Sequence, residues 1–124
     1  SIQVLSGEHG FETWGNFPLE VDKLENLIAQ SGAKGVIILS GDRHISEFSK
    51  TNIDGLSYPL VDFTSSGLTH SYFSFSGEPN QHRIGEVVSE KSYGVITFDF
   101  EKKEADMKMK GDNGTVLQEL KQTY

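Results

Sequence analysis

The sequence has no cysteine among its 124 residues. This absence excludes a disulfide framework and a thiolate zinc site, so any bound metal would need ligands from His, Asp, Glu or Asn. No apolar run approaches the about 20 residues that cross a bilayer, and no basic-then-apolar signal peptide opens the chain. We therefore expect no membrane-spanning segment in these residues.

Positive charge is also scarce, with 11 Lys and Arg residues against 18 Asp and Glu residues and a net charge of -7. An acidic chain repels phosphate backbones, so we expect no nucleic-acid partner. The length suits one domain or part of a larger one. The chain starts at Ser1 and its methionines are Met107 and Met109, so we expect further residues upstream.

Two widespread functional motifs are missing. A serine hydrolase with a strained nucleophile turn needs Gly-x-Ser-x-Gly, and no such pentapeptide occurs. A nucleotide-binding domain would carry Gly-x-Gly-x-x-Gly or a phosphate loop ending in Lys and Ser or Thr, and neither occurs. Both classes are therefore excluded.

The first third of the sequence predicts a helix between two short strands. Residues 2–6 predict the first strand, and apolar residues at helical spacing after Pro18 predict a helix with one buried face. Gly32 is the expected end of this helix. Residues 36–39 are Val-Ile-Ile-Leu, a run without alternation that is typical of a strand covered on both faces, and we expect it to be a central strand.

The rest of the sequence predicts mostly strands. Residues 58–64 alternate, whereas residues 67–90 are rich in Gly, Ser, Asn and Pro around several aromatic residues and predict a long packed loop. From residue 93, three alternating runs predict an antiparallel meander, with Asp106, Lys108 and Lys110 on a face that sees water. The expected fold class is α/β (α+β), a mixed sheet with a C-terminal antiparallel meander.

The strongest candidate for chemistry is the segment Ser-Gly-Asp-Arg-His at residues 40–44, directly after the predicted buried strand. Ligands and catalysis in open α/β sheets concentrate at the carboxyl ends of strands. If the chain stays extended there, Asp42 and His44 project to the same side and can reach one cation. Taken by itself, however, the spacing favours a surface turn with a solvated Asp and His over a metal site, because short motifs often occur by chance.

Flanking motifs favour the functional interpretation. Five segments occur in order, at residues 14–18, 39–44, 58–60, 64–70 and 80–85. Their succession resembles the carboxyl-terminal part of alkaline phosphatase D-like (PhoD-like) metallophosphatases, a branch of the calcineurin-like metallophosphoesterases. The resemblance covers about residues 1–100.

The resemblance implies a metal-dependent phosphoric ester hydrolase, an alkaline phosphatase or phosphodiesterase, built as an α/β/β/α sandwich. Asp42 and His44 would be metal ligands and catalytic residues, acting on a small phosphate ester. The late superfamily motif is Gly-His-x-His, and this chain has Asp42 at its first histidine position, as PhoD-like members do. An oxygen ligand suits hard ions, and the implied pair is iron and calcium, with manganese or zinc as alternatives. The family also favours a periplasmic or secreted location.

Apart from the triplet Asp42-Arg43-His44, which is assigned above to the late motif, the earlier ligand motifs of the superfamily do not occur in this chain. They are Asp-x-His, Gly-Asp-x-x-Asp and Gly-Asn-His followed by Asp or Glu, and they lie upstream of the matched region. We therefore expect residues 1–124 to form the carboxyl-terminal portion of a PhoD-like domain that holds one edge of the active site. The missing upstream half is then a required partner, and the chain alone should be inactive and prone to form a homo-oligomer.

Other residues have weaker assignments. His70 is expected either to approach the metals or the phosphate or to be part of a hydrogen-bonded loop. Arg43 is expected to form a salt bridge or to lie at the surface more readily than to contact substrate. Trp14 is expected to anchor packing, and His9 and His82 to be exposed. The alternative function is a noncatalytic β-rich binding module that uses the aromatic residues 72–75.

Overall fold

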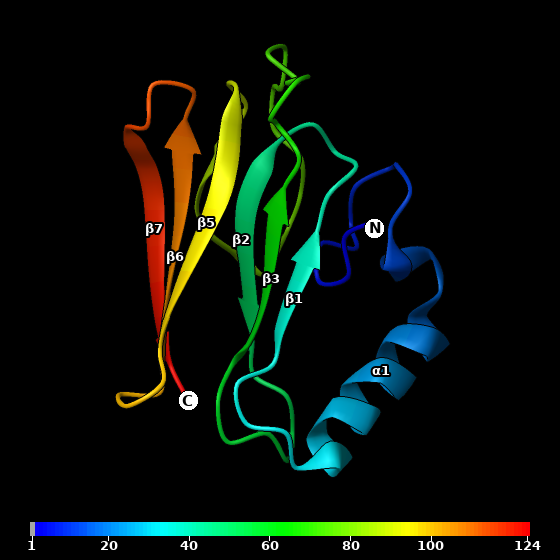
Figure 1. Ribbon diagram of the computed structural model, residues 1–124. Helices are drawn as coiled ribbons and strands as arrows, with labels where there is room; N and C mark the ends of the chain where they lie inside the picture. The colour runs from blue at the N-terminus through cyan, green and yellow to red at the C-terminus, as the bar shows by residue number, and fades with distance from the viewer. Residues whose placement is uncertain (1) are drawn as a thin grey trace.

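The computed structural model describes residues 2–124, which contain two helices and seven strands. The strands form a four-stranded sheet in the order β1-β3-β2-β4 and a three-stranded sheet in the order β5-β6-β7 (Figure 1). The expected mixed class of helix and strands is confirmed. In chain order the elements are η1 (Trp14–Asn16), α1 (Pro18–Ser31), β1 (Ile37–Ser40), β2 (Ser46–Thr51), β3 (Leu60–Ser65), β4 (Arg83–Val88), β5 (Ser92–Asp99), β6 (Glu104–Gly111) and β7 (Val116–Thr123).

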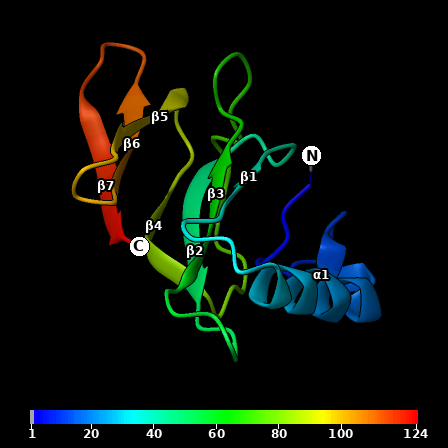
Figure 2. The same ribbon diagram turned by 60° about the horizontal axis from the view of Figure 1, so that its bottom comes forward.

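Two apolar cores separate three layers. Phe48 and Phe63 of the first sheet pack against Met107 and Met109 of the second. On the opposite face of the first sheet, Leu60 belongs to a second core that half-buried residues of α1 and η1 complete. Figure 2 shows α1 on one side of the first sheet and β5, β6 and β7 on the other.

Helix α1 has the bounds that its sequence predicts. It spans Pro18–Ser31 and is capped by Gly32, whose φ of 67° is in the left-handed region that glycine adopts without strain. Its inner face is only half-buried, because Leu24 and Ile28 pack on the second core while Leu27 is 57% exposed. No helix within residues 2–124 combines the length and the apolar character needed to cross a membrane.

Strand β1 lies at an edge of the first sheet, so the expectation of a central strand is wrong. It pairs in parallel with β3. Ile37 packs in the core between the sheets and Ile38 in the core beneath α1, while Leu39 is 59% exposed. The apolar run therefore reflects the two cores that lie on opposite faces of β1. It does not indicate how many strands form hydrogen bonds with β1.

Residues 2–6 do not form the expected strand. The amides of Val4 and Leu5 donate to the carboxylate Oδ2 of Asp62 at 2.8 and 3.0 Å. A side chain thus satisfies two backbone donors that a strand would pair with a neighbouring backbone. The segment therefore lies over the polar side chains of β3, Asp62 and Thr64.

Strands β2 and β4 were not predicted, and β4 lies inside the expected loop of residues 67–90. Glu47 and Ser49 in β2 are buried polar residues, so the strand shows no polar and apolar alternation. When both faces of a strand are buried and the side chains of one face are polar and hydrogen-bonded, burial no longer follows the alternation of polar and apolar residues. That alternation is the signal from which a strand is predicted.

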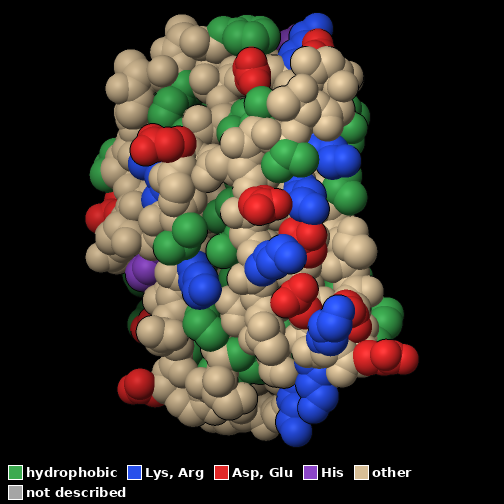
Figure 3. All heavy atoms as spheres, turned by 90° about the vertical axis from the view of Figure 1, so that its left-hand side faces the viewer, with side chains coloured by type: hydrophobic (Ala, Val, Ile, Leu, Met, Phe, Trp, Pro, Cys, Tyr) green, Lys and Arg blue, Asp and Glu red, His purple; other side chains and the backbone are tan. Residues whose placement is uncertain are grey.

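The C-terminal meander is confirmed as β5, β6 and β7, paired antiparallel throughout. Its turn contains Asn113 and Gly114, and Gly114 has a φ of 82°. On the outer face Lys108 forms ion pairs with Asp106 and Glu119. Figure 3 views the molecule from the side where β7 lies in Figure 1, and shows basic and acidic side chains interleaved there.

We expect the isolated 124-residue chain to self-associate through the β5 edge. In residues 2–124, β5 lies at the edge of its sheet; Phe98 within it is 51% exposed, and Phe100 directly after it is 86% exposed. Unpaired strand edges and exposed apolar side chains favour strand pairing with a second copy. Light scattering after size exclusion should show dimers or larger species at micromolar concentration.

A matched pair of variants tests this surface. Phe100→Ser should shift the chain toward monomer, whereas Phe17→Ser, at an exposed phenylalanine beside α1, should not. A strictly monomeric wild-type chain that unfolds cooperatively would contradict the prediction.

Candidate functional site

Two loops leave the same edge of the first sheet. Because β1 and β3 are parallel and in register, with Ser40 opposite Thr64, their carboxyl ends coincide. The turn of residues 41–45 continues from β1 and the loop of residues 66–82 continues from β3; both leave the sheet at the top of Figure 1. We call this the site edge.

The turn is not extended, contrary to the expectation for Asp42 and His44. These two residues have φ values of 73° and 54°, in the left-handed region that non-glycine residues seldom adopt. Both side chains are exposed, while Arg43 between them is buried. The chain must reverse there from β1 into β2, and left-handed residues make so short a reversal possible.

The structure brings His70 next to His44. Their ring centroids are 5.9 Å apart. The amide of Tyr72 donates to the carbonyl of His44 at 2.8 Å, and the amide of Ser66 donates to the carbonyl of Ile45 at 3.1 Å. The two loops are therefore joined by backbone hydrogen bonds on both sides of His70.

Arg43 forms the salt bridge that its position in the sequence suggested. Its Nη2 donates to both carboxylate oxygens of Glu78 at 2.6 Å, and its guanidinium lies 4.2 Å from the centroid of the Phe11 ring. The side chains of Arg43 and Glu78 are 7% and 15% exposed. Arg43 is thus directed into the protein and away from solvent at the site edge.

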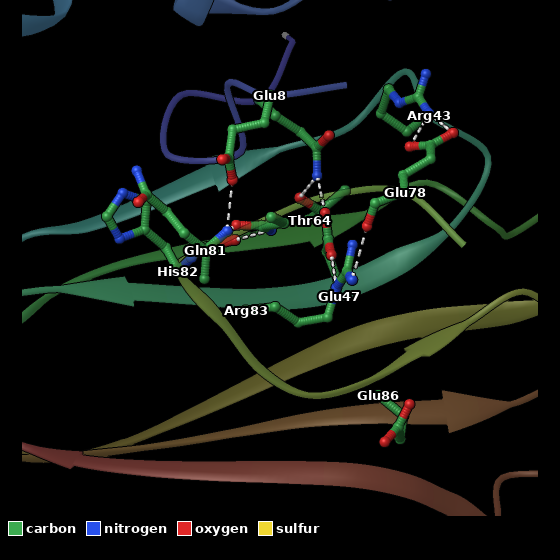
Figure 4. Close-up of polar contacts among 12 residues, drawn as sticks. Glu8, Arg43, Glu47, Thr64, Glu78, Gln81, His82, Arg83 and Glu86 are labelled. Carbon is green, nitrogen blue, oxygen red and sulfur yellow. Dashed lines mark hydrogen bonds and ion pairs between the residues drawn. The ribbon is translucent and has the colours of Figure 1, made fainter. Parts of the chain in front are cut away.

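The ion pair continues into the sheet. Arg83 donates from Nη1 to the carbonyl of Glu78 at 3.0 Å and from Nε to Oε2 of Glu47 at 2.7 Å. Figure 4 shows these contacts joining the loop to β2. We call Arg43, Glu78, Arg83 and Glu47 the charge ladder, because positive and negative groups alternate along it.

Glu47 links the ladder to the N-terminal segment. Gln3 donates from Nε2 to Oε1 of Glu47 at 2.6 Å and to Oγ1 of Thr64 at 2.8 Å. The hydroxyl of Ser40 lies 2.9 Å from that of Thr64 and donates to Oδ1 of Asp62 at 2.6 Å. A continuous buried polar network therefore runs under the site edge.

His9 is 5% exposed, so the expectation that it lies at the surface is wrong. Burial lowers the pKa of His9, and the nearby positive charge of Arg43 lowers it further, against the opposite effects of Glu78 and Glu47. Its ring lies beside Phe11, with 6.1 Å between centroids. His82 is half-buried, while Trp14 packs on the second core as expected.

The donors at the site edge suit a metal but do not complete a site. Asp42 supplies carboxylate oxygens, and His44 and His70 supply imidazole nitrogens, a mixed set that hard and borderline ions accept. Within residues 2–124, no group of three or more His, Asp or Glu side chains is arranged to hold a metal ion. Asp42, His44 and His70 alone are therefore too few to hold a metal ion, and could supply only part of a ligand set.

Comparison with protein-family models, curated proteins and solved structures gave no match for this chain.

Sequence inspection missed the residues that support the site. Gln3, Glu47, Glu78 and Arg83 lie 35 or more residues from at least one of their partners, and no short motif contains such a pair. One indirect signal was present. Glu47 and Ser49 flank Phe48 at alternating positions, and buried polar residues in a strand need partners from elsewhere in the chain.

We expect Asp62→Asn to change the pH dependence of stability. Burial raises the pKa of Asp62 above 3.8, although hydrogen bonds from Ser40, Leu5 and Val4 oppose the shift. The folded chain therefore binds this proton more tightly than the unfolded chain, and the contribution of Asp62 to the free energy of unfolding falls as pH rises through the raised pKa. The amide that replaces the carboxyl group in Asp62→Asn keeps an acceptor oxygen without this titration.

The stability of Asp62→Asn relative to wild type should therefore improve as pH rises from about 4 to 7. Urea unfolding at several pH values measures this, with Asp54→Asn at an exposed turn as the control. Parallel pH profiles for wild type and Asp62→Asn would refute the prediction.

Proposed function

We propose that this chain is the carboxyl-terminal part of a PhoD-like metallophosphatase that hydrolyses small phosphate esters as an alkaline phosphatase or phosphodiesterase. The observation that carries the proposal is the proximity of the His44 and His70 rings at the carboxyl ends of two parallel strands, with His44 on the same turn that exposes Asp42. The order of the five sequence motifs supports it. The layers of α1 and two sheets are compatible with part of an α/β/β/α sandwich.

Each residue at the site edge has a role in this proposal. Asp42 and His44 are metal ligands, with Asp42 favouring a hard ion such as iron, calcium or manganese, and zinc as an alternative. His70 approaches the metal or the phosphoryl group from the β3 side. Arg43 acts on the position of its neighbours and not on substrate, because its guanidinium is buried against Glu78.

The metal ions, when bound, neutralise charge on the phosphoryl oxygens and lower the pKa of the attacking water. The chain's own contribution is to hold one carboxylate and two imidazoles on a rigid edge, open to substrate. Further donors come from residues upstream of Ser1 in the full-length protein. The site is then shared between the two halves of one domain.

The alternative is a noncatalytic binding module that uses the aromatic residues of the loop after β3. Phe73 is 67% exposed and Tyr72 is 37% exposed, on a loop that hydrogen bonds hold to the turn of residues 41–45. Metal content separates the two functions, because a binding module of this kind needs no transition metal.

In the full-length protein, Asp42→Ala and His44→Ala should each lower metal stoichiometry and phosphatase turnover. Removing a ligand should cost more than the roughly 10–100-fold that changes to groups around metal ligands cost. Asp54→Ala, on an exposed turn, is the matched control. Folding should survive because both side chains are exposed, and wild-type metal content with wild-type turnover would remove these residues from the site.

The 124-residue chain alone should hydrolyse no phosphate ester at a measurable rate. Asp42, His44 and His70 are too few donors to hold two metal ions against water and buffer. A nitrophenyl phosphate assay with added iron, calcium, manganese or zinc measures this. Robust turnover that a chelator abolishes would show that residues 1–124 hold a complete site.

A further inference from the structure

The turn that carries Asp42 and His44 has a backbone conformation that non-glycine residues seldom adopt. Both have positive φ values and neither is glycine. Such residues persist where the surrounding structure holds them, and they cluster at functional sites. The residue between them, Arg43, is 8% exposed and is therefore the part of the turn that the protein interior can hold.

The contacts of Arg43 fix the orientation of its guanidinium. Two hydrogen bonds to one carboxylate, both at 2.6 Å, restrain Arg43 against Glu78, and the Phe11 ring covers it at 4.2 Å. Charge-assisted bonds of this kind are short and directional, and an arginine stacked on an aromatic ring has little freedom to rotate. A lysine would supply the charge without this geometry.

Glu78 is itself held by the sheet. Arg83 binds the carbonyl of Glu78 and, through Nε, the carboxylate of Glu47, whose side chain is 2% exposed in β2. The charge ladder therefore connects the turn to a buried strand through the second loop of the site edge (Figure 4). If Arg43 moved out of the protein, it would lose its ion pair with Glu78, whose carbonyl is bound by Arg83.

We propose that Arg43 and Glu78 form a positioning clamp that keeps Asp42 and His44 in their left-handed conformations, with both side chains outside the protein and His44 next to His70. The effect of the clamp on metal binding rests on the proposed function. Its effect on the backbone of the turn does not.

The backbone effect is measured by amide hydrogen exchange in the full-length protein without added metal. The informative amides are those of Tyr72 and Ser66, which donate to the carbonyls of His44 and Ile45. In Glu78→Gln and Arg43→Lys both should exchange at least about 10-fold faster, while amides in β6 keep wild-type rates. Glu86→Gln, at an exposed glutamate drawn apart from the ladder in Figure 4, should leave all of them unchanged.

The functional effect is measured with manganese as the probe ion. Glu78→Gln should weaken manganese binding by about 10–100-fold, and excess manganese should restore turnover. Asp42→Ala should not be restored, since it lacks a ligand and not merely its orientation. If wild-type protein binds no metal, the proposed function fails, and the exchange rates still decide whether the clamp exists.

A double variant separates positioning from folding. Arg43→Met with Glu78→Leu leaves no buried unpaired charge, and replacing a buried ion pair by apolar residues often preserves stability. This variant should unfold at or near the wild-type temperature and yet show fast exchange at Tyr72 and Ser66 with weakened manganese binding. Wild-type exchange and wild-type affinity in the folded double variant would overturn the proposal, as would the same result in Glu78→Gln.

Discussion

The polar network under the site edge depends on one requirement, which is that the buried carboxylate of Glu47 must have hydrogen-bond partners. The residue is 1% exposed, and its two oxygens accept hydrogen bonds from Gln3 and Arg83 at 2.6 and 2.7 Å. Leaving such a charge without its partner costs roughly 3–5 kcal/mol. The N-terminal segment and the start of β4 must therefore both meet β2 at this point.

One face of the first sheet is divided by this requirement. Near one end, Leu60 and Ile38 are apolar and lie in the core under α1. Toward the site edge the same face is polar, with Asp62, Thr64 and Ser40 hydrogen-bonded beneath residues 3–5. The helix covers the apolar part, and an irregular segment whose amides need acceptors covers the polar part. Each cover matches the chemistry beneath it.

The division also accounts for how the site edge can be both rigid and open. In the clamp that we propose, the groups that hold the turn are the buried ions Arg43 and Glu78, whereas Asp42, His44 and His70 are exposed. The two residues with positive φ values lie on either side of Arg43, whose contacts reach toward the sheet.

Regular alternation allowed the meander and β3 to be predicted, and a proline start with a glycine end allowed α1 to be predicted, because these signals are local. Strand β2 escaped prediction since Glu47 and Ser49 are polar yet buried, and residues 2–6 were wrongly expected to pair as a strand because their acceptor is the side chain of Asp62. The edge position of β1 could not be predicted either, because an apolar run indicates only that the faces of a strand are covered and not how many strands pair with it.

For the site, the sequence by itself determined the residue types at positions 42–44 and their place after a strand, since both follow from neighbouring residues. Only the tertiary structure decided that His70 meets His44 and that Glu78, 35 positions from Arg43, binds it. Which buried charge finds which partner depends on how strands far apart in the sequence stack and pair. No local pattern contains that information, because the energy of a buried ion pair resides in its geometry and not in its spacing along the chain.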